Sequence, residues 1–304
     1  MMHYNFLILS WWTVIPNFVD SLSLLSRPTN RHVCLFHDYE TVQGPYFSAL
    51  FDSVFERTGY ASKRMLVIST APPVAEDHLD MMPATTRTLE KLENDLGLEA
   101  CQRIFLSQYN PWSLLDKLDQ FQPTILWIDN DSNAFGLRHL MKISGLDGII
   151  QQRCDSAAKE SAVLYVGQGA GSICAGATMS LALLRGDDPK LVPEPQFFGL
   201  QLLGPQRSIY FDDDPTVIQK QFDILDKPDE ITILPEDRVF VFSQLGMEAT
   251  SFVMNPTRRG MIESLQSYAP LEPLIEDIGG RHCAGEPAVD PSRRIQNIGD
   301  SEWF

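Results

Sequence analysis

The stretch A-V-L-Y-V-G-Q-G-A-G-S-I-C-A-G, which runs from Ala162 to Gly176, decides the fold of this chain. Its first residues form a short apolar run typical of a buried β-strand. A glycine-rich turn follows, and then small residues typical of a closely packed helix. In an open α/β sheet, ligands bind at the carboxyl ends of the strands. A sharp strand–turn–helix of this kind is also the geometry of a nucleophile elbow. We therefore expect the functional site at this turn.

Strands and helices alternate along the chain up to this stretch. Apolar runs predict strands at residues 33–36, 65–69, 103–106, 124–129 and 162–167. Stretches with helical periodicity lie between and after them, at residues 46–55, 86–98, 111–121, 135–144, 149–160 and 170–184. This alternation predicts βαβ units, and the near-continuous apolar strands predict a parallel sheet covered by helices on both faces.

The carboxyl-terminal half has a different pattern. Apolar runs predict strands at 200–211 and 231–234 with a helix at 215–225 between them, and then short hairpin-type strands at 238–243, 249–254 and 260–263. No repeat or obvious linker divides the chain. We expect an N-terminal helical arm at residues 1–30, a single α/β domain at residues 31–265, and an extended C-terminal tail at residues 266–304.

The composition is that of an ordinary soluble globular protein, with 44% hydrophobic and 21% charged residues among 304. Lys and Arg number 24 against 40 Asp and Glu, so the net charge is −16. This acidity argues against nucleic acid or an anionic membrane surface as a partner, because both attract basic faces. The five cysteines are far apart, which favours buried thiols in a reducing compartment and predicts no metal site.

The N-terminal segment contains an apolar run, Phe6–Ile15, that lacks the basic residues of a signal peptide and is too short to span a bilayer. We expect it to belong to an arm packed on the domain of a cytoplasmic protein, with a targeting segment as the alternative. The glycine-rich turn also resembles a dinucleotide loop, but no acidic ribose ligand follows at the required distance, so no cofactor is predicted.

The turn and its flanks resemble the peptidase family of dipeptidase E and cyanophycinase. Tyr165, Gly167, Ala170 and Gly171 match the family motif Y-x-G-x-S-A-G. Similarity extends upstream through residues 125–137 and downstream through residues 186–210, and covers roughly residues 33–254. The resemblance implies a three-layer α/β/α sandwich with a mainly parallel sheet, of the class I glutamine amidotransferase-like (flavodoxin-like) type.

The catalytic residues that the resemblance implies are mostly missing. Gly169 stands at the position of the nucleophilic serine, and glycine has no side chain that could form an acyl-enzyme. Tyr210 stands at the position of the catalytic histidine, and a tyrosine is a poor general base at neutral pH. Asn130 and Asp131 fall in the turn that would supply oxyanion-hole amides, where a carboxylate would repel a developing oxyanion. Only Asp187 remains at a position of the triad.

Two nearby residues offer substitute nucleophiles. Ser172 and Cys174 follow Gly169 by three and five residues, which places both inside the predicted helix rather than at the elbow. An ordinary first-turn serine and a buried helical thiol are the favoured interpretations.

Polar residues remain at the predicted carboxyl edge of the sheet. They are the candidate ligand-binding residues Asp129, Asn130, Asp131, Gln168, Ala170 and His37 and the candidate catalytic residues Asp187 and Tyr210. An edge so rich in carboxylates suits a cationic or proton-donating ligand.

Three functions stay open at this point. The leading hypothesis is a repurposed enzyme that acts on a small amino-acid- or peptide-derived metabolite by acid–base chemistry, with Asp187 and Tyr210 as its catalytic groups. The alternatives are a non-catalytic binding protein and a serine peptidase whose nucleophile is replaced by Gly169. A small-molecule or peptide-like ligand is expected as the partner, and a homodimer is possible.

Overall fold

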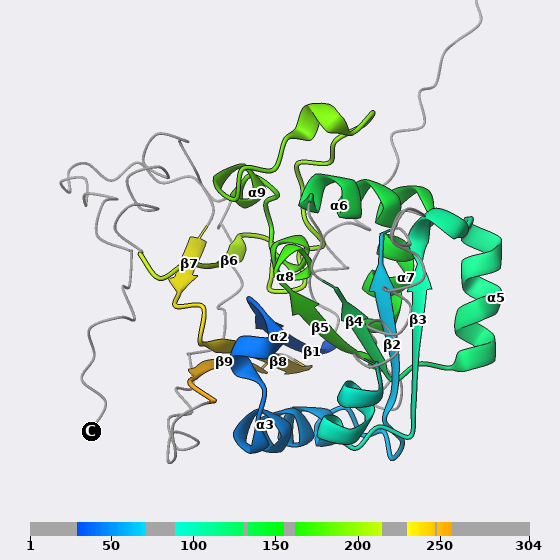
Figure 1. Cartoon of the computed structure of the whole chain (residues 1–304), viewed down its shortest axis with the longest axis vertical. Coiled ribbons are helices and arrows are strands. Elements are labelled where there is room, and N and C mark those ends of the chain that lie inside the picture. Colours follow the sequence, from blue (N-terminus) through cyan, green and yellow to red (C-terminus); the bar gives the residue numbers. More distant parts are fainter. Residues whose placement is uncertain are drawn as a thin grey trace, which may run out of the picture.

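A seven-stranded β-sheet runs through the centre of the molecule (Figure 1). The computed structural model describes residues 29–70, 89–129, 133–154, 162–214, 230–246 and 248–256. The strands of this sheet are β1 (Thr29–Phe36), β2 (Arg64–Ser69), β3 (Ala100–Phe105), β4 (Ile125–Ile128), β5 (Leu164–Gln168), β8 (Val239–Gly246) and β9 (Glu248–Met254). They lie side by side in the order β3-β2-β4-β5-β1-β8-β9.

The pairing of these strands confirms the predicted parallel sheet. β3, β2, β4, β5 and β1 run parallel to their neighbours. β8 pairs antiparallel with β1, and β9 pairs antiparallel with β8. The hairpin-type strands predicted at 238–243 and 249–254 therefore extend the same sheet instead of forming a separate unit.

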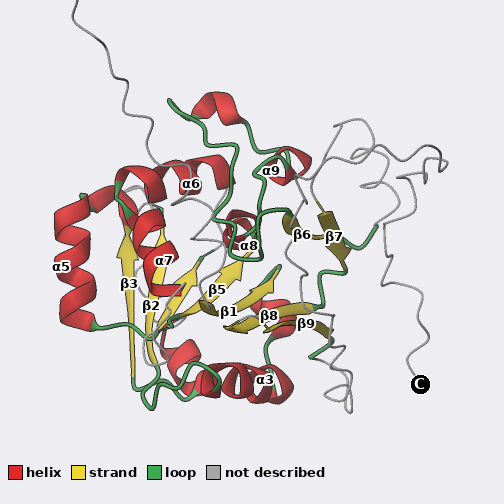
Figure 2. Cartoon of the chain, turned by 180° about the vertical axis from the view of Figure 1, so that it is seen from behind, coloured by secondary structure: helices red, strands yellow, loops and turns green. Residues whose placement is uncertain are grey.

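Helices cover both faces of the sheet (Figure 2). They are α2 (Tyr39–Val42), α3 (Pro45–Glu56), α5 (Pro111–Phe121), α6 (Ala134–Ile143), α7 (Leu146–Cys154), α8 (Ala170–Ala175) and α9 (Leu181–Leu184), with 3-10 turns at Leu106–Gln108 and Pro189–Leu191. Residues 89–96 are also helical. The core on one face is shared with α2, α3 and helical residues 89–96, and the core on the other face with α5, α6, α7 and α8. The fold is thus the predicted three-layer α/β/α sandwich.

Alternation of side chains along the strands produces the two cores. Val33 and Leu35 on β1 point to the face covered by α6 and α8, whereas Cys34 and Phe36 point to the face covered by α3. All four side chains are fully buried. A strand buried on both faces has no polar position, and this explains why the predicted strands read as continuous apolar runs.

The helix predicted at 170–184 is wrong as a single element. α8 ends at Ala175 because Gly176 is extended, with φ −74° and ψ −174°. The next two backbone N–H groups, of Ala177 and Thr178, donate to Oγ of Ser208 at 2.9 and 3.2 Å. A side chain far along the chain thus replaces the helical acceptors, and helical structure returns only at α9.

The strand predicted at 200–211 is also too long. Only Arg207–Phe211 is a strand, β6, and it pairs in parallel with β7 (Glu230–Leu234) in a separate two-stranded sheet. The preceding residues turn instead, with positive φ at Gln201 (+56°) and Gly204 (+103°).

Several predictions fall outside the described residues. These are the N-terminal arm, the helix at 215–225, the strand at 260–263 and the C-terminal tail. Within the part of the chain that the structure describes, no helix combines the length and apolar character needed to cross a membrane.

Candidate functional site

The turn between β5 and α8 has the backbone of a nucleophile elbow. Gly169 adopts φ +49° and ψ −106°, a conformation that residues with a Cβ rarely adopt. Its N–H donates to the carbonyl of Phe36 on the neighbouring strand at 3.0 Å, which ties the turn to the sheet. The predicted elbow is therefore present in its geometry, and the residue at its tip carries no reactive group.

Close packing explains the glycines on either side of the tip. A Cβ on Gly167 would lie 2.8 Å from the carbonyl oxygen of Gly171, and a Cβ on Gly171 would lie 2.5 Å from the carbonyl oxygen of Ile128. Real Cβ atoms do not approach backbone oxygens this closely, so the helix reaches this position over the strands only with glycine at both sites. The turn is thus required by the packing of α8 on β4 and β5.

Ser172 is not placed to act as a nucleophile. Its side chain is buried, and its hydroxyl oxygen lies 2.7 Å from the carbonyl of Gly167 and 2.9 Å from the carbonyl of Phe36. A hydroxyl that donates to main-chain carbonyls holds the turn against β1 and β5. This geometry agrees with the interpretation of Ser172 as an ordinary residue of the first helical turn.

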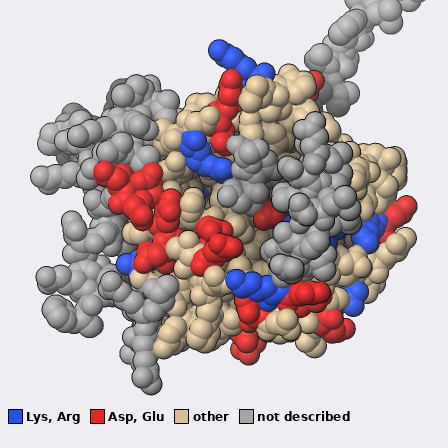
Figure 3. All heavy atoms as spheres, viewed as in Figure 1, with Lys and Arg blue, Asp and Glu red and all other residues tan. Residues whose placement is uncertain are grey.

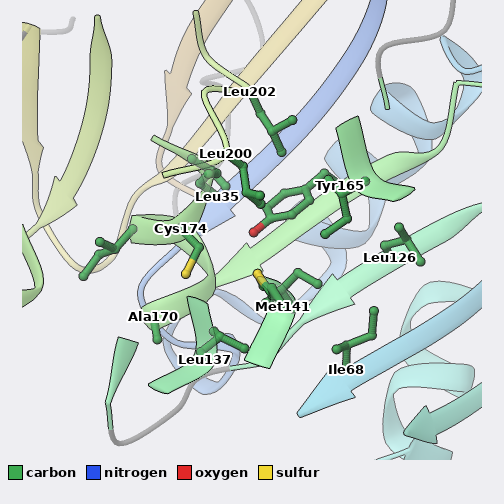
Figure 4. Close-up of a cluster of buried hydrophobic side chains, with 14 of the residues drawn as sticks. Leu35, Ile68, Leu126, Leu137, Met141, Tyr165, Ala170, Cys174, Leu200 and Leu202 are labelled. Atoms are coloured by element: carbon green, nitrogen blue, oxygen red, sulfur yellow. The ribbon is translucent and has the colours of Figure 1, made fainter. Parts of the chain in front are cut away.

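Cys174 is buried in the apolar core between α8 and the sheet (Figure 4). Figure 4 places its sulfur among Leu137, Met141 and Tyr165. Its Sγ lies 4.0 Å from the carbonyl oxygen of Ala134. The thiol packs as an apolar group, as expected for a cysteine inside a helix.

Asp187 lies at the amino end of α6. Its Oδ2 accepts a hydrogen bond from the N–H of Ala134 at 2.8 Å, and the residue is 8% exposed. Asn133 completes this helix start, because its Oδ1 accepts from Gly136 N–H at 3.1 Å and its Nδ2 donates to the carbonyl of Asp188 at 3.1 Å. A carboxylate at a helix amino end is stabilised by the unpaired N–H groups and the helix dipole. Asp187 therefore has a structural role, whatever its chemistry.

Tyr210 lies on β6 and is buried. Burial, followed by the negative charge of Asp212, raises its pKa to about 12, although the positive charge of Arg185 acts in the opposite direction. The phenol is thus neutral throughout the physiological range. It can donate a hydrogen bond or a proton, and it cannot serve as a general base.

A second polar group lies on the side of the sheet edge that faces α3. Gln168 is paired in register with Phe36, whose side chain points to the α3 face. The side-chain Nε2 of Gln168 donates to Oδ1 of Asp38 at 2.8 Å, so the residues that end β5 and follow β1 are linked.

Asp129 continues this polar group beyond β4. Its Oδ2 accepts from the hydroxyl of Ser69 at 3.0 Å and lies 3.3 Å from Nη2 of Arg103. The two charged side chains are 23% and 16% exposed, so the pair is only partly screened by water. Asp38, Ser69 and Arg103 were not among the predicted site residues. For Asp38 and Ser69 the available signal was their place at the carboxyl ends of neighbouring strands, where parallel strands bring side chains together, whereas Arg103 lies within β3.

The remaining predicted residues are distributed around these groups. His37 forms an exposed pair with Glu236, with 3.4 Å between Nδ1 and Oε2. Ala170 begins α8 and contributes its side chain to the core. Asn130 and Asp131 lie outside the described residues.

Acidic side chains gather on the surface over β6, β7 and α2 (Figure 3).

Among the described residues, no group of three or more His, Cys, Asp and Glu has an arrangement that could hold a metal ion.

The structure therefore separates the predicted site into two groups on either side of the elbow. Asp187 lies with the α6 start and Tyr210 on β6, both on the side of α8. Gln168 and Asp129 lie on the side of α3 with Asp38, Ser69 and Arg103. Gly169 lies between the two groups, at the end of β5.

Comparison with known proteins identifies the fold. No protein-family profile and no curated protein matches the chain. Among solved structures, a candidate peptidase E protein from Listeria monocytogenes EGD-e matches with a TM-score of 0.51 and 17% sequence identity, over 74% of this chain and 99% of its own. A peptidase from an acI-B1 actinobacterium matches with a TM-score of 0.45 and 14% identity, over 75% of this chain and 90% of its own. The first similarity shows that the chain has a peptidase E-like fold.

Proposed function

We propose that this protein binds a small amino-acid- or peptide-derived ligand on a peptidase E-like fold and does not hydrolyse it through an acyl-enzyme. The observation that carries the proposal is the elbow itself. Gly169 has the positive φ of +49° at the tip of the turn, which a residue with a Cβ would adopt only under strain, and it offers no nucleophile. The turn would expose the side chain of whatever residue stands at position 169, and glycine has none.

The neighbouring groups support the absence of covalent chemistry. Ser172 is buried against two main-chain carbonyls, and Cys174 is buried among apolar side chains. Tyr210, with its pKa near 12, remains protonated and does not supply the base that would activate a hydroxyl. These side chains therefore offer neither an accessible nucleophile nor the base that a serine mechanism needs.

The polar group on the α3 side indicates the class of ligand. The carboxylates of Asp38 and Asp129 would accept hydrogen bonds from an ammonium group, and the guanidinium of Arg103 would face a carboxylate. A ligand with both groups, such as an amino acid or a short peptide, matches this arrangement better than a phosphate does. The acidic surface over β6, β7 and α2 favours approach of a cationic ligand as well.

Acid–base catalysis by Asp187 and Tyr210 is the second candidate function. Its support is that Tyr210 is held in the protonated form, as a proton donor must be, and that the charge of Asp187 acts on it. Against it, the Asp187 carboxylate already accepts a helix N–H. A Tyr210→Phe variant that binds ligand normally but loses turnover would favour this candidate over simple binding.

The binding proposal is tested by calorimetry on the full chain with a panel of free amino acids and dipeptides. We expect saturable binding of at least one zwitterionic compound without hydrolysis, and weaker binding by Asp129→Asn. Asp119→Asn, which likewise breaks a carboxylate–arginine pair but on α5 across the sheet, is the matched control and should bind normally. If no zwitterion of the panel binds, or if wild-type protein cleaves a dipeptide, the proposal is wrong.

A Gly169→Ser variant tests the third possibility, that glycine stands where a working peptidase would have serine. We expect no hydrolysis of dipeptides, because no histidine stands at position 210 to act as the base. Hydrolysis by this variant would show that the rest of the machinery is intact and would restore the peptidase interpretation.

A further inference from the structure

Helix α5 exposes apolar side chains on its outer face. Trp112 is 79% exposed and Leu115 is 38% exposed, although Leu114, Leu118 and Phe121 on the same helix are buried against the sheet. A single exposed apolar side chain is normal, but a grouped set that includes an exposed tryptophan is typical of an interaction surface. α5 lies at the outer edge of the molecule in both views (Figures 1 and 2).

The exposed residues of α5 follow helical spacing. Trp112, Leu115 and Asp116 are separated by three and four positions, so they lie on one face over adjacent turns. Asp119 continues this stripe but is already paired with Arg153 of its own chain at 2.9 Å. The stripe thus changes along the helix from apolar at its start to acidic at Asp116.

The start of α5 meets the end of α6. An added Cβ on Gly145, which follows α6, would lie 3.3 Å from Cβ of Pro111 at the start of α5. Ile143 and Lys142, the last residues of α6, are both exposed, and Ile143 is 53% exposed. The last turn of α6 therefore lies near the Trp112 end of the stripe, and the acidic Asp116 lies toward its other end. Lys142 is exposed and its Nζ donates to Oε1 of Gln196 at 3.2 Å, a neutral partner that leaves its positive charge unbalanced there.

We propose that this face, formed by Trp112, Leu115, Asp116, Lys142 and Ile143, is the contact between two copies of this chain. Around a two-fold axis between Trp112 and Leu115, the α5 helices of the two copies run antiparallel. Trp112 of each copy then packs on Leu115 of the other. The same rotation brings Asp116 of one copy to the Lys142 end of the other, so the opposite charges meet twice. A face that is apolar in the middle and oppositely charged at its ends is complementary to itself, as an isologous dimer requires.

The charge pattern favours a second copy over the other occupants of such a face. A non-identical partner would need no basic and acidic ends related in this way. The apolar N-terminal run Phe6–Ile15 of the same chain would cover Trp112 and Leu115, but it contains no charged residue that would pair with Asp116 or Lys142. Each occupant predicts a different oligomeric state.

Sedimentation of the full-length chain over a concentration series tests the proposal. We expect a reversible monomer–dimer equilibrium for the wild type and at least a tenfold higher dissociation constant for Trp112→Ser, because an aromatic residue at the centre of a contact contributes strongly to its affinity. Leu245→Ser is the matched control. It removes another exposed apolar side chain, 52% exposed on β8, and should leave the equilibrium unchanged.

Reversing the charges of Lys142 and Asp116 tests whether the two copies are related by the proposed two-fold axis, independently of the apolar contact between Trp112 and Leu115. Lys142→Glu and Asp116→Lys should each weaken the dimer, and the double variant should recover affinity because the two signs are exchanged together. Sedimentation as a monomer at every concentration overturns the proposal and indicates a different occupant of the face. An unchanged dimer in Trp112→Ser, or a double variant weaker than both single variants, overturns it equally. Near-wild-type circular dichroism of each variant confirms that the fold is intact.

Discussion

The backbone of the elbow and the polar group on its α3 side differ in how they are held. The backbone from Gly167 to Gly171 makes contacts so close that a Cβ on either of these two glycines would not fit. The side chains of Gln168 and Asp129 are instead held by hydrogen bonds and an ion pair that are partly exposed to solvent. The first arrangement is demanded by the packing of α8 on the sheet, and the second allows exchange of its polar partners for a ligand. Close packing thus accounts for the glycines of this turn, and the geometry of the turn does not by itself imply a nucleophile.

The largest effect is expected within the turn. Gly171→Ala places a Cβ 2.5 Å from the carbonyl oxygen of Ile128, so α8 must shift away from β4 to make room for it. We expect a loss of about 3 kcal/mol in the free energy of unfolding, measured by urea denaturation. Gly148→Ala in α7, where a Cβ would meet nothing within 4 Å, is the control and should stabilise by up to about 1 kcal/mol. Equal stabilities of the two variants would show that the turn is not close-packed.

Strand β1 extends the comparison to pH, because a buried histidine, His32, lies within it and a more exposed one, His37, follows its last residue. Burial, followed by the charge of Arg57, lowers the pKa of His32 from 6.5 to about 4. The unfolded chain therefore binds more protons than the folded chain between these values, and the free energy of unfolding falls as pH falls from 6.5 to 4. The expected loss from this residue is about 3 kcal/mol.

Urea denaturation over this pH range measures the contribution of His32. His32→Asn should flatten the decline, whereas His37→Asn, directly after the same strand, should change stability by only a few tenths of a kcal/mol. A decline of the same steepness in His32→Asn and wild type would contradict the buried, neutral state of His32.

A smaller effect is expected at the start of α6. Asp187→Ala removes the acceptor for the Ala134 N–H and should lower the free energy of unfolding by about 1–2 kcal/mol. Asp187→Asn keeps an acceptor oxygen and should recover most of this loss. If both variants are as stable as wild type, Asp187 has no capping role and its carboxylate is available for chemistry.

The smallest effect on stability is expected on the α3 side of the elbow. Asp129→Asn breaks the pair with Arg103 but leaves an oxygen that Ser69 can still bond, so the free energy of unfolding should change by less than about 1 kcal/mol. The same variant should lose the thermal shift that a zwitterionic ligand produces in wild type. A large loss of stability with normal ligand binding would mean that this polar group is structural, like the turn.

Much of the fold was predictable from local pattern. Continuous apolar runs at 65–69 and 124–129 indicated strands buried on both faces, and β2 and β4 occupy them. The helix predicted at 170–184 failed because its break depends on Ser208, whose hydroxyl accepts from Ala177 and Thr178 across some thirty residues of chain. No local pattern carries that information.

The sequence predicted where the candidate site lies in the fold but only some of the residues that form it. Gly169, Gln168, Asp129 and His37 lie at the carboxyl edge of the sheet because each follows or ends a parallel strand. Arg103 was missed because it lies within β3. The sequence of this strand has only a weak apolar pattern, and nothing in it indicates that the Arg103 side chain reaches Asp129. The capping role of Asp187 was missed because its partner, Ala134, lies 53 positions earlier in the chain.

The sequence by itself determined two properties of this protein. Strands that alternate with helices form a parallel sheet, because the alternation is a local pattern. The residue at position 169 has no side chain, because that depends only on which amino acid stands there. The tertiary structure alone decided which polar residues contact one another around the glycine-rich turn. That arrangement depends on contacts between residues far apart in the chain, and these contacts exist only after the sheet has brought the strands into register.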